Sequence, residues 1–128
     1  MLKLIIIDDE KSGRELLTTL LGICCDNIKV VAQAESIEDG IYAIILYRPD
    51  IVMLDIRMQD GCGFELLKKF NPIDFKIIFI SASEEYIPEA SAFNPIDYIL
   101  KPVSPEYLIS AIRKAEKSLN LVNEIALI

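Results

Sequence analysis

Two short stretches decide the fold: LKLIIIDDE at residues 2–10 and DIVMLDIRM at residues 50–58. In each stretch, a run of apolar residues ends at an aspartate. Short continuous apolar runs are typical of strands that are buried on both faces, as they are in parallel sheets. Comparable runs lie at residues 28–32, 77–80 and 96–100, so we expect five buried strands.

Helical patterns separate these predicted strands. Residues 16–24 carry apolar side chains at steps of three and four, which is the spacing of one helix face. The further predicted helices are one from Ser36 with a capping arrangement at Asp39, one over 64–70, one over 84–92 that Pro88 should shorten or distort, and one over 105–119 that Ser104 precedes. A strand and a helix thus alternate along the chain. This order predicts a doubly wound α/β fold, with a parallel sheet and helices on both of its faces.

Length and charge restrict the function. The chain has 128 residues, which suits one domain, and we predict that this domain covers residues 1–119. Residues 120–128 form a tail that could extend the last helix, pair with another chain or begin a linker. The net charge is −7, which predicts no direct binding of nucleic acid by this domain. The apolar runs are too short for a bilayer and no signal peptide is recognisable, so we expect a cytoplasmic protein that does not bind membranes.

The cysteines and the lack of histidine exclude other chemistries. The cysteines are Cys24, Cys25 and Cys62, and the chain contains no histidine. Neighbouring Cys24 and Cys25 match no usual zinc spacing, so we expect reduced thiols, one of which fills the apolar face of a helix. Serine–histidine and cysteine–histidine nucleophiles are excluded because both need a histidine.

Polar side chains follow four of the predicted strands. Asp8, Asp9 and Glu10 follow the first strand, Asp55 the third, Ser81 the fourth and Lys101 the fifth. In a doubly wound sheet these strand ends meet at one edge, where such folds place their ligand sites. Asp9 alone could be a helix cap, but a cluster of carboxylates needs another explanation because the negative charges repel one another.

A divalent cation would relieve this repulsion. Mg²⁺ prefers oxygen ligands and retains some water, so clustered carboxylates suit it, and Mn²⁺ should substitute. The same residue types suit phosphoryl transfer, because a carboxylate can be the nucleophile that forms an aspartyl phosphate. The metal and the lysine would neutralise charge on the transferring oxygens, and the hydroxyl would hydrogen-bond one of them.

Five motifs together resemble the response-regulator receiver domain of bacterial two-component signalling, over residues 2–119. These motifs are IIIDDE at 5–10, DIVMLDIRM at 50–58, GFEL at 63–66, IFISA at 78–82 and DYILKP at 97–102. Each motif is modestly specific, but all occur in order and with the right spacing. The resemblance implies a flavodoxin-like, five-stranded parallel sheet with the strand order 2-1-3-4-5.

The resemblance also implies roles for the residues at the strand ends. Asp55 would be the phosphoacceptor, which a histidine kinase phosphorylates in a reaction that depends on Mg²⁺. Asp9 would bind the ion directly and Asp8 through water, and the backbone carbonyl of Arg57 would be a further ligand beside Asp55. Lys101 would contact the phosphoryl group, and the Lys101-Pro102 bond resembles the family's cis peptide.

Signalling would depend on a switch pair. Ser81 and Tyr98 match the family's switch residues, and we expect phosphorylation to alter the face of the fourth helix, fifth strand and fifth helix. That face would then form a homodimer. Residues 84–93, 96–98 and 104–115 resemble receivers that precede LytTR-type DNA-binding domains, which implies transcription regulation in a phosphorelay through a domain outside this chain. The chain would not be an enzyme for other substrates, since a receiver catalyses only its own phosphorylation and dephosphorylation.

Gln59 departs from the family pattern, which usually has proline after the Met of this loop. Together with the glycine-rich residues 60–63, this departure predicts a mobile loop or hinge.

Three alternatives fit less well. A haloacid-dehalogenase-type hydrolase needs a second Asp two residues after the nucleophile, where this chain has Arg57. A flavodoxin-like mononucleotide binder needs a phosphate-cradling loop after the first strand, where this chain has acids. A protein-interaction domain with a vestigial pocket would not need both Asp55 and Lys101.

Overall fold

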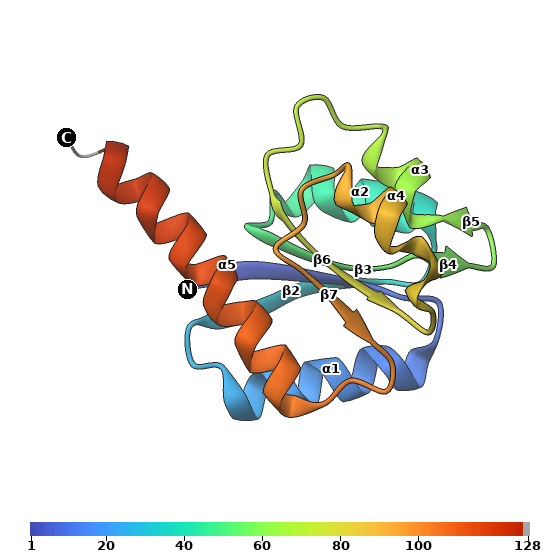
Figure 1. Cartoon of the computed structure of the whole chain (residues 1–128), viewed down its shortest axis with the longest axis horizontal. Coiled ribbons are helices and arrows are strands. Elements are labelled where there is room, and N and C mark those ends of the chain that lie inside the picture. The colour runs from blue at the N-terminus through green and yellow to red at the C-terminus, as the bar shows by residue number, and fades with distance from the viewer. Residues whose placement is uncertain (127–128) are drawn as a thin grey trace.

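The computed structural model describes the backbone of residues 1–126 and the side chains of residues 1–120. Its sheet has five parallel strands, which are β1 (Leu2–Ile7), β2 (Ile28–Ala34), β3 (Ile51–Asp55), β6 (Lys76–Ser81) and β7 (Asp97–Leu100). The spatial order is β2-β1-β3-β6-β7 (Figure 1). This order confirms the predicted arrangement 2-1-3-4-5, in which β6 and β7 are the fourth and fifth strands of the sheet.

Two strands run one residue further than predicted. Asp55 is the last residue of β3 and Ser81 is the last residue of β6. Both side chains are therefore carried by backbone that still belongs to the sheet, instead of by the loops that follow. This attachment restricts the positions that the two side chains can take.

Helices cover both faces of the sheet (Figure 1). On one face lie α1 (Lys11–Cys24) and α5 (Pro105–Ala126), and on the other lie α2 (Ile37–Tyr47), α3 (Gly63–Leu67) and α4 (Ile87–Ser91). Successive residues of a strand point to opposite faces. Leu4 and Ile6 of β1 therefore belong to the core beneath α1 and α5, while Ile5 and Ile7 belong to the other core. Because both faces of the strand are buried in this way, its sequence is a continuous apolar run without polar residues at alternate positions.

The predicted starts of the second and fifth helices are confirmed. The Ser36 hydroxyl accepts a hydrogen bond from the Asp39 N–H at 3.0 Å at the start of α2. Pro105 is the first residue of α5. This helix is longer than predicted, because it continues through Ala126 and so includes most of the predicted tail. Residues 127 and 128 lie outside the described residues.

The two short helices differ from their predicted ranges. α3 ends at Leu67 instead of residue 70, because the Lys69 and Phe70 N–H groups bond to carbonyls three residues back in a tighter turn. The predicted helix over 84–92 is split into a 3₁₀ turn η1 (Glu84–Tyr86) and α4. The distortion expected from Pro88 is thus confirmed. Pro88 lies in the first turn of α4, where its missing N–H costs nothing.

A small hairpin follows Asp55. β4 (Arg57–Met58) pairs in antiparallel fashion with β5 (Gly61–Cys62). Gly61 has a φ of 147°, a conformation that side chains disfavour, and a Cβ there would lie 2.9 Å from Ile37. The Asp60 carboxylate accepts hydrogen bonds of 3.0 and 3.2 Å from the Ile37 N–H at the start of α2. A hydrogen-bonded turn therefore lies where the sequence predicted a mobile loop or hinge, and its mobility stays a prediction.

Two further expectations concern membrane-spanning segments and the state of the cysteines. None of the described helices combines the length and the apolar character needed to cross a bilayer. The cysteines are free thiols, and Cys25 is buried in the core beside α1 and α5. Burial raises the pKa of the Cys25 thiol, which keeps it protonated near neutral pH.

Candidate functional site

Polar side chains converge at the carboxyl edge of the sheet. Asp8, Asp55 and Ser81 are buried, with exposed fractions of 2%, 6% and 2%. They lie at the ends of β1, β3 and β6, which are neighbours in the sheet. Lys101 follows the next strand, β7, and its backbone N–H donates to the Ser81 carbonyl at 2.8 Å. The topology alone therefore brings these four residues to one place.

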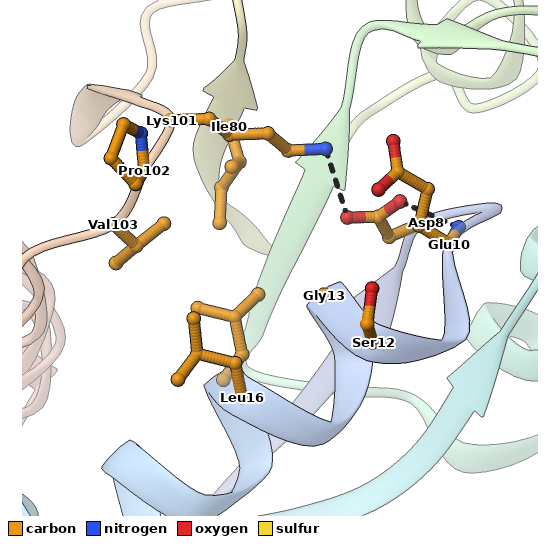
Figure 2. Close-up of a pocket in the computed structure, with 10 residues that line it drawn as sticks. Asp8, Glu10, Ser12, Gly13, Leu16, Ile80, Lys101, Pro102 and Val103 are labelled. Carbon is orange, nitrogen blue, oxygen red and sulfur yellow. Dashed lines mark hydrogen bonds and ion pairs between the residues drawn. The ribbon is translucent and has the colours of Figure 1, made fainter.

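The Lys101 side chain joins two of the carboxylates. Its Nζ lies 3.0 Å from Oδ2 of Asp55 and 3.2 Å from Oδ2 of Asp8. Figure 2 shows the lysine reaching from the β7 side across to Asp8, above the first turn of α1. One ammonium group thus faces two buried carboxylates, and their charges are only partly neutralised.

Asp9 completes a group of three carboxylates. One oxygen each from Asp8, Asp9 and Asp55 can be chosen so that all three lie within 4.8 Å of one another. The donors are all hard carboxylate oxygens, which suit Mg²⁺ or Mn²⁺ better than softer metals. The residues present therefore fit a small divalent cation. Glu10, although adjacent in sequence, does not belong to this group.

Burial controls the ionisation of Asp55. Desolvation raises the pKa of Asp55 from 3.8 to about 6, although Lys101 opposes the rise and Asp8 adds to it. Burial would lower the pKa of Lys101, but its contacts with Asp55 and Asp8 outweigh that effect and raise the pKa. At neutral pH the site therefore holds an ionised carboxylate beside a protonated amine, in a setting that disfavours the extra negative charge.

Backbone groups hold the two acids of the first strand, and the sequence did not indicate these contacts. The Glu10 N–H donates to Oδ1 of Asp8 at 2.9 Å, and the Gln59 N–H donates to Oδ2 of Asp9 at 2.9 Å. Asp9 is therefore not a cap of α1, because Glu10 is the residue before that helix and makes no side-chain cap.

Two residues of α1 also reach the site. The Arg14 guanidinium donates to the Asp8 carbonyl at 2.7 Å. A Cβ at Gly13 would lie 2.8 Å from Oδ2 of Asp8, so only glycine leaves that carboxylate its place. A glycine in the first turn of an otherwise good helix was the available sequence signal for this close approach.

The predicted switch residues share a partner. The Ser81 hydroxyl accepts a hydrogen bond from the Ser83 N–H at 3.2 Å, and the Tyr98 hydroxyl donates to the Ser83 carbonyl at 2.6 Å. Tyr98 is half-buried with its ring near Phe79, and burial raises the pKa of its hydroxyl. Ser83, which the sequence did not single out, therefore links both residues through its backbone.

Two cavities border the carboxylates. One of about 190 Å³ gives access to Asp55 and is lined also by Arg57, Ser81, Tyr86 and Lys101. The other, of about 210 Å³, lies between α1 and the loop after β7 and contains Leu16, Pro102 and Val103 beside Asp8 (Figure 2). A reactant that enters the first cavity meets the Asp55 carboxylate and the lysine together.

Apolar side chains are exposed on the face predicted to bind a partner, which α4, β7 and α5 form. Ile87, Leu100 and Tyr107 are exposed, with exposed fractions of 43%, 38% and 69%. Phe93, which follows α4, stacks on Phe64 with 5.4 Å between ring centroids and is partly buried against the core.

The geometry and the comparisons agree. The family model described as "Response regulator receiver domain" matches residues 4–113 of the chain. The chain belongs to the response-regulator receiver family. Its fold resembles the receiver domain of AraT, a response regulator from Geobacillus stearothermophilus, with a TM-score of 0.87 and 28% identity over 95% of this chain and 98% of that one.

Curated relatives extend beyond the receiver. The chain is 36% identical to the sensory transduction protein LytT of Bacillus cereus, over 91% of this chain and 48% of that protein. It is 38% identical to an uncharacterized response regulatory protein of Vibrio vulnificus, over 92% of this chain and 49% of that protein. The chain thus spans about half the length of the curated relatives it matches. The LytT similarity is consistent with a LytTR-type regulator.

Proposed function

We propose that Asp55 is the phosphoacceptor of this receiver domain and that its donor is the phosphohistidine of a cognate histidine kinase. The observation that supports this proposal best is a single ammonium, Lys101 Nζ, 3.0 Å from a buried carboxylate that borders a cavity. A carboxylate in this setting is ionised near neutral pH but poorly solvated, which favours attack on phosphorus.

The chain's own residues account for the chemistry. An Asp55 oxygen attacks the phosphorus, the P–N bond breaks, and its electron pair goes to the imidazole nitrogen, which takes a proton. Lys101 stays protonated and neutralises charge on the transferring oxygens. Ser81, at the end of the neighbouring strand, would donate its hydroxyl hydrogen to an oxygen of the new acyl phosphate. Later hydrolysis returns Asp55, so the domain catalyses only its own phosphorylation and dephosphorylation.

A divalent cation belongs to this proposal. Asp8, Asp9 and Asp55, with the backbone carbonyl of Arg57, would hold Mg²⁺, for which Mn²⁺ should substitute. When bound, the ion supplies positive charge beside the oxygens of the phosphoryl group.

We propose that phosphorylation of Asp55 signals by changing the surface that α4, β7 and α5 form. When Ser81 turns toward a phosphoryl oxygen, it gives up the Ser83 N–H, and the contact of Tyr98 with Ser83 is disturbed. The exposed residues of α4, β7 and α5 would then pair with a second copy of the chain. In a longer cytoplasmic regulator, a LytTR-type DNA-binding domain would convert this pairing into transcription control, while the receiver within residues 1–119 would itself bind neither nucleic acid nor membrane.

Intact-mass measurement after incubation with acetyl phosphate tests the phosphoacceptor. With Mg²⁺ we expect the addition of one phosphoryl group, no addition for Asp55→Asn, and normal addition for the exposed control Asp74→Asn. Undiminished labelling of Asp55→Asn would contradict the assignment, and undiminished labelling of the parent in EDTA would contradict the role of the metal.

A further inference from the structure

The hairpin after Asp55 approaches the proposed metal site from outside the sheet. Its turn lies between the pair Met58 and Gly61 and so consists of Gln59 and Asp60. Both side chains are exposed, yet both residues make hydrogen bonds to distant parts of the chain. The turn is therefore fixed by contacts that its residue types do not reveal.

The first contact restrains a proposed metal ligand. The backbone N–H of Gln59 lies 2.9 Å from Oδ2 of Asp9, fifty residues away in sequence. Asp9 is less buried than Asp8 and has no ion pair with Lys101, whereas Asp8 does. Without the N–H, the Asp9 carboxylate would have freedom to turn toward solvent, away from Asp8 and Asp55.

The second contact restrains the turn itself. Both Asp60 carboxylate oxygens accept from the Ile37 N–H, the first backbone donor of α2. Such donors at a helix start lack intrahelical partners, and a carboxylate there is stabilised by the helix dipole. Ser36 serves a different donor, Asp39, so the two caps do not compete. The start of α2 thus holds the turn that holds Asp9.

We infer that Gln59 is a positioning residue for the metal site, acting through its backbone N–H on the Asp9 carboxylate, with Asp60 anchoring the turn on α2. The inference rests on the proposed function, since it concerns the metal site of that proposal. A carboxylate oxygen can accept this bond and leave the other oxygen for the cation. Outer partners of this kind orient metal ligands, and their loss typically weakens metal binding.

The test is a titration of purified protein with Mn²⁺ alone, in which electron paramagnetic resonance counts the free ion. Gln59→Pro removes the N–H and introduces the residue that the family usually has at this position, so the inferred restraint on Asp9 is particular to this chain. Gln59→Ala removes the side chain and keeps the N–H. We expect the Kd for Mn²⁺ to rise by about tenfold in Gln59→Pro and to stay within about twofold in Gln59→Ala. Asp60→Ala should produce an intermediate rise.

Equal Kd values for the proline and alanine variants would overturn the inference while leaving the metal site intact. A parent chain that binds no Mn²⁺ would contradict the metal site itself, and the positioning role with it. Should Gln59→Pro fail to fold, amide hydrogen exchange decides the matter: Asp9→Ala should accelerate exchange at the Gln59 N–H and leave the Gly63 N–H, which donates to the Ile56 carbonyl at 2.7 Å, unchanged. An unchanged Gln59 rate would overturn the inference.

Discussion

The middle and the carboxyl end of β1 and β3 are both buried, but the middle is apolar and the end carries charge. In β1 and β3, residues Leu4–Ile7 and Ile51–Leu54 are fully buried and wholly apolar. One residue further on, Asp8 and Asp55 are almost as deeply buried and carry charge. Burial of apolar groups stabilises a fold, whereas burial of a carboxylate with incomplete neutralisation destabilises it.

This contrast separates stability from function within one strand. The apolar middle packs the sheet between its two helix layers. The stability of this packing keeps the Asp8 and Asp55 carboxylates close together although they repel each other. The raised pKa of Asp55 reflects mainly its desolvation, to which repulsion by Asp8 adds. Substitutions at the two places should therefore change stability in opposite directions.

The largest effect is expected in the apolar middle. Ile5 is fully buried in the core beneath α2, α3 and α4, so Ile5→Ala should lower the free energy of unfolding by about 2–5 kcal/mol. Urea unfolding measures this loss. The matched control Ile23→Ala removes a side chain that is 73% exposed and should change stability by less than about 0.5 kcal/mol. A similar loss in both variants would contradict the assignment of the core.

The sequence predicted the middle of the strands better than their surroundings. Apolar runs and the alternation with helices were enough to predict a doubly wound parallel sheet, whereas the strand order came from the family resemblance. Parallel topology was enough to bring Asp8, Asp55 and Lys101 together. The contacts of Gln59 with Asp9 and of Asp60 with Ile37 could not be predicted, because a backbone N–H carries no sequence signal.

The second prediction concerns the charged end. Without metal, Asp55→Asn should stabilise the fold at pH 7, by at most about 3 kcal/mol, because it removes a buried charge whose pKa is raised from 3.8 to about 6. The unfolded state ionises first as the pH rises, so the parent loses stability between about pH 4 and pH 6. The advantage of the variant should therefore vanish near pH 4.

Thermal unfolding in EDTA from pH 4 to pH 7 measures this difference, with Asp74→Asn as an exposed control. Addition of Mg²⁺ should stabilise the parent and reduce the advantage of Asp55→Asn, since a ligand that binds the folded state raises its stability. A variant that is less stable than the parent at pH 7 in EDTA would show that Asp55 stabilises the fold instead.

The third prediction concerns Lys101, which supplies the positive charge beside the buried carboxylates. The lysine faces both Asp8 and Asp55, and its loss leaves two buried carboxylates without their cation. We expect a loss of about 2 kcal/mol at pH 7 in EDTA, less than for a fully buried pair because the lysine is partly exposed. The control Lys114→Ala breaks the more exposed pair with Asp97 and should cost under about 1 kcal/mol. Equal losses in the two variants would contradict the role of Lys101, and Mg²⁺ should compensate only for the loss of Lys101.

The smallest effect is expected for Tyr98→Phe, which tests how the charged end communicates with the surface. The Tyr98 hydroxyl donates to the Ser83 carbonyl at 2.6 Å, so its removal should cost about 1 kcal/mol and accelerate amide exchange in the following turn, η1. Tyr42→Phe is the control, because that side chain is 64% exposed and lies on α2, outside the proposed dimer face. With beryllofluoride as a phosphoryl mimic, sedimentation should show dimerisation of the parent and of Tyr42→Phe but a weaker response of Tyr98→Phe. If Tyr98→Phe dimerises like the parent, the signal does not pass through Ser83, and the bond stabilises the loop without transmitting the state of Asp55.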